Sequence, residues 1–220
     1  MKEPLVKLCG NRSLADLAKT TSSGATHLGF IFVKKTKRYV RPENVGRWVN
    51  LLRPRQKLVG VFVEPSIQEL EEVLHFVDLD VIQLHGNETV SELLKIKEAF
   101  GLPVWKVIHH HKDGEKLMEV FQGVADGYVI DSKVEGSHGG TGVSFDWEAV
   151  PKYRDLAHEQ SVSCLIAGGI TPERVEELMT FNPEGIDLSS GVEVNEQKDI
   201  GKIQSLMREV ERYVASIPGR

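Results

Sequence analysis

The sequence predicts an α/β protein, a single (β/α)8 (TIM) barrel domain that spans residues 1–220. Two observations carry this prediction. Eight short apolar runs recur along the chain, each followed by a stretch with helical periodicity, and several runs are apolar at nearly every position. Strands that are covered on both faces, as in a parallel sheet, have this composition. A chain of 220 residues lies near the small end of the range for such barrels.

The expected strands are rich in valine, isoleucine, leucine and phenylalanine. They are residues 5–9, 27–33, 58–63, 81–85, 104–109, 127–131, 164–168 and 185–189. A doubly wound open sheet is the alternative architecture, and the count of eight favours the barrel. In both folds, ligands bind beyond the carboxyl ends of the strands.

Helical patterns lie between these strands. Ser13 begins the first, and residues 66–77 (SIQELEEVLHFV) carry an apolar stripe at helical spacing. Thr89 and Glu92 form a capping box, in which each side chain satisfies a free backbone N–H group. The segment 171–173 (TPE) predicts a helix with proline at its first position, and residue 199 begins the last helix. The apolar stripes are expected to pack against the sheet.

Composition limits the class of partner. The net charge is -5, with 40% hydrophobic and 27% charged residues, so no global charge favours nucleic acid or an anionic membrane. Two cysteines do not make a disulfide framework, which favours a reducing compartment. The N-terminal residues lack the apolar core of a signal peptide, and no apolar run is long enough to span a membrane. These features predict a cytoplasmic protein with a small-molecule partner.

Polar residues at the ends of the expected strands define a candidate site. Cys9 ends the first strand, Asp131 ends the sixth, and Asp187 lies in the eighth. Arg38 follows the second strand in the segment KKTKR, and His85, after the fourth, is expected to line the site without a catalytic role. Because the carboxyl ends of barrel strands meet at one face, these side chains should gather there.

The loops after the seventh and eighth strands predict a phosphate site, because glycine lets the backbone approach an anion closely. Tight turns alone are the alternative explanation. The long segment 132–145 is also rich in glycine and could form a mobile lid over the substrate, or a solvated loop. The candidate phosphate-binding residues are Gly142, Gly168, Gly169, Ser189, Ser190 and Gly191.

Other polar residues have simpler explanations. Free cysteine usually packs as a small apolar residue, and position alone does not separate that role from a catalytic one for Cys9. Cys164 begins the seventh strand, at the opposite end of the barrel, and is expected in the core. The adjacent histidines at 109–111 point in different directions and cannot easily share an ion, so no metal site is predicted.

Several motifs together resemble the phosphoribosylanthranilate isomerase family of tryptophan biosynthesis. They run in order from about residue 6 to 199: KLCGNRS, LGFIFVKKTKRYVRPE, VGVFV, DVIQLHG, DGYVIDS, GGTGVSFDW, IAGGITPE and GIDLSSGVE. The resemblance implies a (β/α)8 barrel and an Amadori rearrangement of N-(5-phosphoribosyl)anthranilate to 1-(2-carboxyphenylamino)-1-deoxyribulose 5-phosphate. It implies a phosphorylated aminosugar as partner, and neither a metal nor an organic cofactor.

The same resemblance assigns roles to four residues. Cys9 matches the general base and Asp131 the general acid, while Arg38 matches the arginine expected to hold the anthranilate carboxylate. Asp187 matches a position that contacts the substrate. One departure is the stretch VNEQKD at 194–199, where many members have a glycine. The conformation of the turn at 192–198 is therefore not predicted.

Two other functions compete with this one. A different phosphosugar barrel enzyme is the first, either an epimerase or a lyase. A metal-dependent epimerase would need histidine and aspartate ligands on several strand ends, and an indole-forming lyase would want a strand-end lysine, whereas Lys106 lies within its strand. A non-catalytic phosphate-binding module is the second, and it would not need both Cys9 and Asp131. Nothing in the sequence distinguishes a monomer from a dimer.

Overall fold

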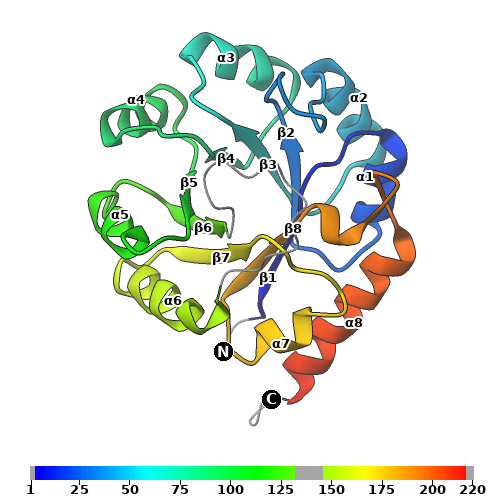
Figure 1. Ribbon diagram of the computed structural model, residues 1–220. Coiled ribbons are helices and arrows are strands. Elements are labelled where there is room, and N and C mark those ends of the chain that lie inside the picture. The colour runs from blue at the N-terminus through cyan, green and yellow to red at the C-terminus, as the bar shows by residue number, and fades with distance from the viewer. Residues whose placement is uncertain (1–2, 132–145, 217–220) are drawn as a thin grey trace.

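The computed structural model describes residues 3–131 and 146–216. Within them, eight parallel strands close into a barrel in sequence order, with β8 pairing back to β1. Figure 1 shows the helices arranged in a ring outside the strands. The predicted (β/α)8 barrel is therefore confirmed. The strands are β1 Leu5–Leu8, β2 His27–Ile31, β3 Lys57–Phe62, β4 Val81–Leu84, β5 Val104–His109, β6 Gly127–Asp131, β7 Ser163–Ala167 and β8 Gly185–Leu188.

The helices begin where the sequence supplies capping groups. The Ser13 side chain accepts a hydrogen bond from the N–H of Asp16, and the predicted capping box of Thr89 and Glu92 is present. Ser66 and Glu69 form a second capping box. The helices are α1 Leu14–Thr21, α2 Pro42–Leu52, α3 Ile67–Phe76, α4 Val90–Phe100, α5 Gly114–Val120, α6 Val150–Glu159, α7 Val175–Met179 and α8 Ile200–Ser216, with short 3-10 helices η1 Trp147–Ala149 and η2 Ser190–Val192.

Two segments differ from the simplest prediction. The regular part of α7 begins at Val175, later than predicted, because a turn precedes it in which the Thr171 carbonyl accepts from the N–H groups of Arg174 and Val175. The chain between β8 and α8 forms an antiparallel hairpin of β9 Glu193–Val194 and β10 Gln197–Lys198. Its turn residues, Asn195 and Glu196, have φ of 48° and 61°, a left-handed conformation reached here without glycine.

Side chains alternate between the barrel interior and the layer under the helices, as the pleat of a strand requires. The larger core lies between strands and helices, and a smaller apolar cluster fills the barrel itself. That inner cluster contains Val59, Val81, Trp105, Val107, Val129, Leu165 and Ala167. Further toward the carboxyl ends of the strands, the inward positions become polar, and this change in chemistry locates the site.

The opposite end of the barrel is held by carboxylates that precede the strands. Asp126 accepts from the N–H of Val104 at 2.8 Å and from Lys97 Nζ at 2.8 Å. Asp80 accepts from the N–H of Leu58 at 2.7 Å. Each carboxylate satisfies a donor at a strand start, so this end contributes to stability.

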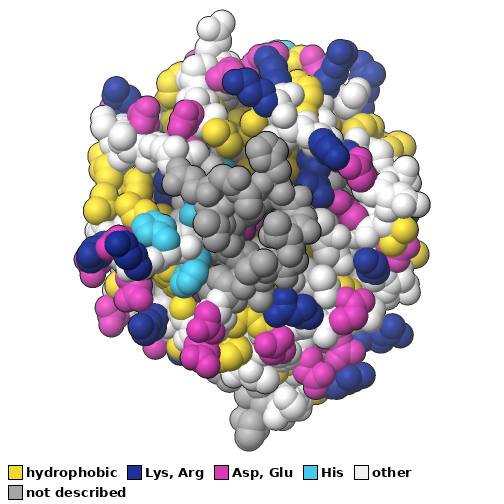
Figure 2. All heavy atoms as spheres, in the orientation of Figure 1, with side chains coloured by type: hydrophobic (Ala, Val, Ile, Leu, Met, Phe, Trp, Pro, Cys, Tyr) yellow, Lys and Arg dark blue, Asp and Glu magenta, His cyan; other side chains and the backbone are white. Residues whose placement is uncertain are grey.

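The surface carries charges of both signs. Figure 2 shows acidic and basic side chains interspersed around the rim of the viewed face. Among the described residues, no helix combines the length and the apolar character that a membrane crossing requires.

Candidate active site

A buried ion pair joins the first and last strands. Lys7 Nζ lies 2.7 Å from Asp187 Oδ2, and the two residues are direct neighbours in the register of β1 and β8. Burial alone would lower the pKa of Lys7, but the charges and hydrogen bonds of Asp187 and Cys9 together outweigh burial, and the pKa is raised. The second oxygen, Asp187 Oδ1, is buried and has no hydrogen-bond partner among the described residues. A buried acceptor of this kind is suited to a donor on a ligand.

Cys9 follows Lys7 on the same face of β1 and is 6% exposed. Its N–H donates to the Leu188 carbonyl at 2.7 Å, which fixes the backbone at the strand end. Gly29 on β2 makes room for the thiol, since a Cβ there would lie 2.6 Å from Cys9 Sγ. Burial raises the pKa of the Cys9 thiol, and the Lys7 ammonium opposes this effect. Lys7 is therefore close enough to favour the thiolate, although burial has the larger influence.

Cys164 has a different environment. It is the second residue of β7, is 1% exposed and belongs to the core between strands and helices. Burial raises the pKa of its thiol well above the ordinary range. The expectation that Cys164 is a core residue is confirmed, and both cysteines are free thiols.

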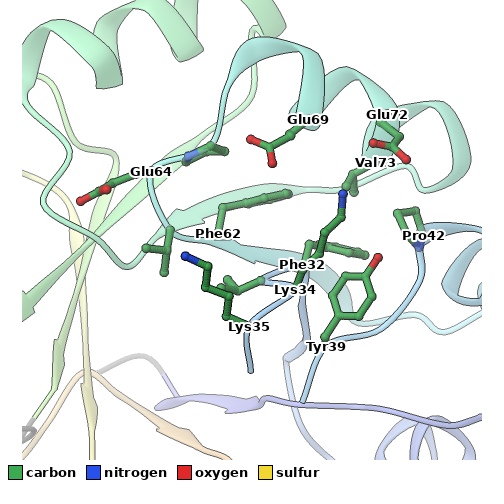
Figure 3. A pocket seen from close by; sticks show the side chains of 13 residues that line it. Phe32, Lys34, Lys35, Tyr39, Pro42, Phe62, Glu64, Glu69, Glu72 and Val73 are labelled. Atoms are coloured by element: carbon green, nitrogen blue, oxygen red, sulfur yellow. The ribbon is translucent and has the colours of Figure 1, made fainter. Parts of the chain in front are cut away.

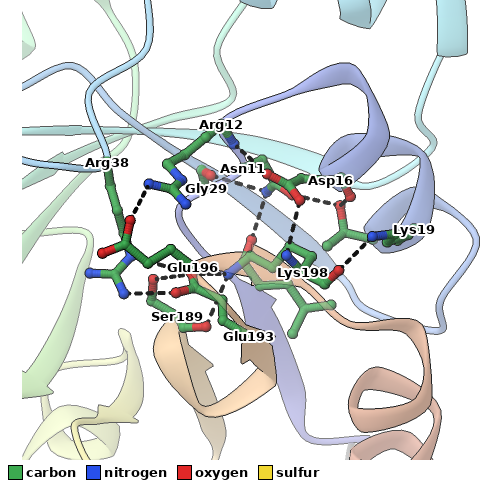
Figure 4. Close-up of polar contacts among 12 residues, drawn as sticks. Asn11, Arg12, Asp16, Lys19, Gly29, Arg38, Ser189, Glu193, Glu196 and Lys198 are labelled. Carbon is green, nitrogen blue, oxygen red and sulfur yellow. Dashed lines mark hydrogen bonds and ion pairs between the residues drawn. The ribbon is translucent and has the colours of Figure 1, made fainter. Parts of the chain in front are cut away.

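Arg38 is held by a carboxylate that the sequence analysis did not identify. Its Nη2 donates to Glu193 Oε2 at 2.8 Å and its Nε to Glu193 Oε1 at 3.3 Å (Figure 4). Lys198 Nζ donates to the same Oε1 at 2.9 Å and is fully buried. Burial alone would raise the pKa of Glu193, but hydrogen bonds from Arg38 and the charge of Lys198 lower it to about 2. The three side chains form a cluster with a formal charge of +1.

This charged cluster lies directly beside the strand ends. Gly10 has φ of 77°, and a Cβ there would lie 2.8 Å from Ser189 Oγ and 2.9 Å from Arg38 Cδ. Only glycine combines this backbone conformation with so little space. The residue after Cys9 therefore lets Arg38 and Ser189 approach the end of β1.

The hairpin that carries Glu193 is anchored to α1. The N–H of Lys198 donates to Asp16 Oδ1 at 2.9 Å, and the Lys198 carbonyl accepts from Lys19 Nζ at 2.7 Å (Figure 4). These contacts hold a short hairpin in place that could not be stable alone. Glu193 was detectable as the last residue of the quoted motif GIDLSSGVE, whereas nothing in the sequence pattern marks Lys198.

Asp131 lies on the other side of the site with two histidines. His85 Nε2 is 3.3 Å from Asp131 Oδ2, and the His85 and His109 rings are 5.4 Å apart between centroids. His109 and Asp131 are register partners on β5 and β6, so both point inward. From the sequence, His109 was predicted only to be one of three adjacent histidines that do not share an ion. One signal could have distinguished His109 from His110 and His111. Side chains alternate along a strand, and this alternation places Trp105, Val107 and His109 on one face.

The loops after β7 and β8 meet, as a joint anion site requires. A Cβ at Gly191 would overlap the Ile170 carbonyl, so the two loop backbones are in direct contact. Gly168 and Gly169 have φ of 84° and 67°, and Ser190 begins η2. Among the predicted phosphate ligands, Gly142 lies outside the described residues, as does the predicted lid at 132–145.

A separate pocket lies outside this set of residues. It has a volume of about 380 Å³ and opens between the loops after β2 and β3, beside Pro42 and Val73 (Figure 3). Its floor includes Phe32 and Phe62, whose rings stack at 5.4 Å. None of the predicted site residues lines it, so it does not replace the strand-end site.

The strand-end arrangement defines a class of protein. A buried thiol, a carboxyl beside histidine and a cluster of net positive charge surround the carboxyl end of a (β/α)8 barrel. Groups from different strands can act on opposite sides of one ligand, and the positive cluster suits an anionic one. This is the layout of a barrel enzyme that moves protons on a small anionic substrate.

Comparison with known proteins identifies the family. Residues 6–209 match the family described as N-(5'-phosphoribosyl)anthranilate (PRA) isomerase. The chain is 49% identical over 211 residues to the N-(5'-phosphoribosyl)anthranilate isomerase of Geobacillus thermodenitrificans, covering 96% of this chain and 95% of the relative. It is 43% identical over 215 residues to that of Bacillus subtilis, covering 98% and 99%.

Solved structures agree with this result. The phosphoribosyl anthranilate isomerase of Thermotoga maritima superposes with a TM-score of 0.83 at 30% identity, covering 95% of this chain and 99% of that one. A phosphoribosyl anthranilate isomerase in complex with reduced 1-(o-carboxyphenylamino)-1-deoxyribulose 5-phosphate gives 0.80 at 29% identity, with the same coverage. The chain belongs to the N-(5'-phosphoribosyl)anthranilate isomerase family, and the resemblance found in the motifs is confirmed.

Proposed function

We propose that this isomerase converts N-(5-phosphoribosyl)anthranilate into 1-(2-carboxyphenylamino)-1-deoxyribulose 5-phosphate, a step of tryptophan biosynthesis. The observation that carries the proposal is the placement of Cys9 and Asp131. Cys9 immediately follows β1 and Asp131 ends β6, and both residues are buried at the carboxyl end of the barrel. An aldose-to-ketose rearrangement needs one acid and one base on different sides of the sugar, and these two residues meet that need.

Asp131 is the proposed acid. It gives its proton to the furanose ring oxygen, the C1–O bond breaks, and the nitrogen lone pair forms a Schiff base at C1. Because an ordinary aspartate is mostly ionised at neutral pH, Asp131 must hold a proton when the substrate binds. His85 Nε2, 3.3 Å from Asp131 Oδ2, supports the orientation of this carboxyl.

Cys9 is the proposed base. Its thiolate removes the proton from C2, the electrons of that bond form the C1–C2 double bond of an enolamine, and the iminium nitrogen is neutralised. The enolamine then tautomerises to the 2-ketone. Lys7 favours the thiolate, and Asp187 Oδ1 is a buried acceptor available to a substrate N–H or hydroxyl. In this scheme Lys7 supports the reacting thiolate of Cys9, and Asp187 orients the substrate by accepting a hydrogen bond from it.

Arg38 is proposed to bind the anthranilate carboxylate. A guanidinium presents several N–H donors in one plane, so Arg38 can keep Glu193 on one edge and accept a second carboxylate on another. Lys198 matters here because it compensates the charge of Glu193 and leaves a formal +1 for the ligand. Without Lys198, the carboxylates of Glu193 and substrate would share a single positive charge.

The phosphate is proposed to bind at the loops after β7 and β8, to backbone amides near Gly168, Gly169, Ser190 and Gly191 and to Ser189, with Gly142 completing the site. Residues 1–220 would act as one catalytic domain, and the cytoplasm is the proposed compartment. The scheme uses proton transfers among protein side chains and needs no organic cofactor.

A fluorescence assay tests the reaction. Purified protein should deplete phosphoribosylanthranilate, and the product should be the 1-deoxyribulose phosphate. A different phosphosugar enzyme would turn over another substrate and leave this one intact, whereas a binding module would retain it unchanged. Inorganic phosphate should also slow hydrogen exchange at the amides of 168–169 and 190–191. Protection confined to the opposite end of the barrel would contradict the phosphate assignment.

A further inference from the structure

Three metal-ligating side chains converge at the ends of three consecutive strands. His85 follows β4, His109 ends β5 and Asp131 ends β6. The N–H of His85 donates to the Phe62 carbonyl at 2.8 Å, so its backbone is held by the sheet although it lies beyond the strand. His109 and Asp131 are register partners. Their common position is therefore set by the barrel itself, which positions a site more accurately than a flexible loop does.

The donor atoms are close enough for one ion. One ligand atom from each residue lies within 4.8 Å of the other two, and His85 Nε2 is 3.3 Å from Asp131 Oδ2. Zinc binds histidine nitrogen and carboxylate oxygen at about 2.0–2.2 Å, which places two tetrahedral ligands about 3.3–3.6 Å apart. The His85–Asp131 pair already has such a separation, and a ring nitrogen of His109 lies within 4.8 Å of both partners.

The chemistry of the set is also suitable. Two imidazoles and one carboxylate match the ligands of zinc and related divalent transition ions, with a fourth position left for water. The neighbouring histidines do not belong to it: His110 Nδ1 lies 2.9 Å from the Tyr153 hydroxyl, and His111 is exposed. The His85 side chain is 29% exposed, so an ion can approach it from solvent. Figure 2 shows histidine side chains on this face of the molecule. Ala167, the register partner of Asp131 on β7, adds no bulk on the other side.

We propose that His85, His109 and Asp131 bind a divalent transition-metal ion such as Zn²⁺, and that this ion inhibits the enzyme reversibly. A carboxylate must be deprotonated to bind a metal. An ion on Asp131 therefore removes the proton that the rearrangement needs and occupies space beside the sugar. The binding part is independent of the proposed function, and the inhibition part rests on it.

Zinc binding to the full-length protein is the first test, measured by isothermal titration without substrate. One Zn²⁺ per chain is expected. Removal of a residue that merely hydrogen-bonds to a metal ligand already lowers metal affinity about 10–100-fold. Removal of a ligand itself should cost more, so His85→Gln and His109→Gln should each weaken zinc binding by at least about 100-fold. His111→Gln is the matched control and should bind like the wild type. Circular dichroism confirms that the variants fold, and unchanged affinity in either ligand variant overturns the site.

Cobalt supplies a second readout of the ligands. Co²⁺ bound at this site should give d–d absorption without a sulfur-to-cobalt band, because no thiolate takes part. A strong thiolate band would instead place the ion on a cysteine and overturn the proposal.

Inhibition is then measured for each variant relative to its own metal-free rate. Zn²⁺ should inhibit the wild type and the His111→Gln enzyme, and a chelator should restore the rate. The same Zn²⁺ concentration should leave the His109→Gln rate close to its metal-free value. Binding without inhibition would overturn the inhibitory role and also count against Asp131 as the acid, whereas absent binding would leave the proposed function untouched.

Discussion

Arg38 and Glu193 form a two-point ion pair at the carboxyl end of the barrel, with N–O distances of 2.8 Å and 3.3 Å. They lie far apart in the sequence, one after β2 and the other in the hairpin after β8. The pair holds the guanidinium in one orientation, since the Arg38 side chain is 32% exposed and would otherwise be free to move. A planar donor that is oriented before binding loses less conformational entropy when a carboxylate arrives.

Arg38→Ala should therefore weaken substrate binding. A hydrogen bond to a charged group contributes about 1.5–3 kcal/mol, so kcat/KM should fall roughly 10- to 100-fold, mainly through KM. Steady-state kinetics measures the change. Lys37→Ala is the matched control, because Lys37 is the adjacent residue, its side chain is 83% exposed and it pairs only at the surface with Glu196. Wild-type kcat/KM in the Arg38 variant would remove Arg38 from the site.

Asp131→Asn should nearly abolish turnover and still bind a product analogue. The amide keeps the shape of the carboxyl but cannot deliver the proton that opens the ring. Single-turnover kinetics and analogue titration separate the two effects. Asp126→Asn provides the comparison, because Asp126 caps β5 at the opposite end and should lower stability while sparing kcat. Near-normal turnover in the Asp131 variant would require a different acid.

The barrel and the strand-end candidates could be predicted from local sequence. Apolar runs fix which residues face inward, and the residue that ends each run then points beyond the sheet. Cys9 and Asp131 lie at such positions, and Asp187 is one residue before the end of β8. The Thr89–Glu92 capping box was predictable because it depends on two residues only three positions apart. These features can be predicted without knowing which distant segments of the chain are in contact in the fold.

Features that depend on closure of the barrel could not be predicted in this way. The Arg38–Glu193 pair requires the segments that follow β2 and β8, the two strands flanking β1, to meet beyond the end of β1. Lys198 lies opposite Glu193 in the β9–β10 hairpin, which α1 anchors. The grouping of His109 with Asp131 depends on strand register, which the sequence does not state. Close packing decides such contacts, and hydrophobic periodicity carries no information about them.

The hairpin turn offers a test of backbone strain. Glu196 has φ of 61°, and a left-handed conformation costs a residue other than glycine about 1–2 kcal/mol. Glu196→Gly should therefore raise the free energy of unfolding by about 1 kcal/mol relative to Glu196→Ala, measured by chemical denaturation. Both variants lose the surface pairs with Arg12 and Lys37, so these contacts cancel in the comparison. Equal stability of the two variants would show that the turn is not strained.

His27 should make stability depend on pH. It is 5% exposed inside the barrel, with its ring 5.2 Å from that of Trp105, and burial lowers its pKa from 6.5 to about 4. Below pH 6.5 the unfolded chain binds a proton that the folded chain does not bind until about pH 4. Stability is therefore lost as pH falls through this window, by up to about 3 kcal/mol for this group.

The variant His27→Gln removes the titrating group and keeps a polar side chain of similar size. Between pH 7 and pH 4, its free energy of unfolding should fall less than that of the wild type, as measured by denaturant titration at each pH. His75→Gln, on the exposed surface of α3, should follow the wild-type curve. Parallel curves for wild type and His27→Gln would contradict the pKa assigned to His27.

Cys9 should react with iodoacetamide at a rate set by its thiolate fraction. Burial raises the pKa of the Cys9 thiol above its ordinary range, so labelling should accelerate with pH in the alkaline range, and bound product should slow it. The double variant Lys7→Met with Asp187→Asn removes the ion pair without leaving a lone charge. Lys7 lowers the pKa of the Cys9 thiol more than Asp187 raises it, so the variant should react more slowly at each pH. Mass spectrometry should find Cys164 unlabelled in the folded protein.

Cys9→Ser tests the role of the thiol directly. Serine keeps the size of the side chain and fits beside Gly29, but its hydroxyl is far harder to ionise than a thiol. The variant should fold normally, bind a product analogue and lose orders of magnitude in kcat. Cys164→Ser is the comparison with the same chemical change in the core, and it should affect stability more than kcat. A Cys9→Ser enzyme that works near the wild-type rate would move the base to another residue at the strand ends. Asp187 is then a candidate, because its buried Oδ1 has no hydrogen-bond partner within residues 3–131 and 146–216.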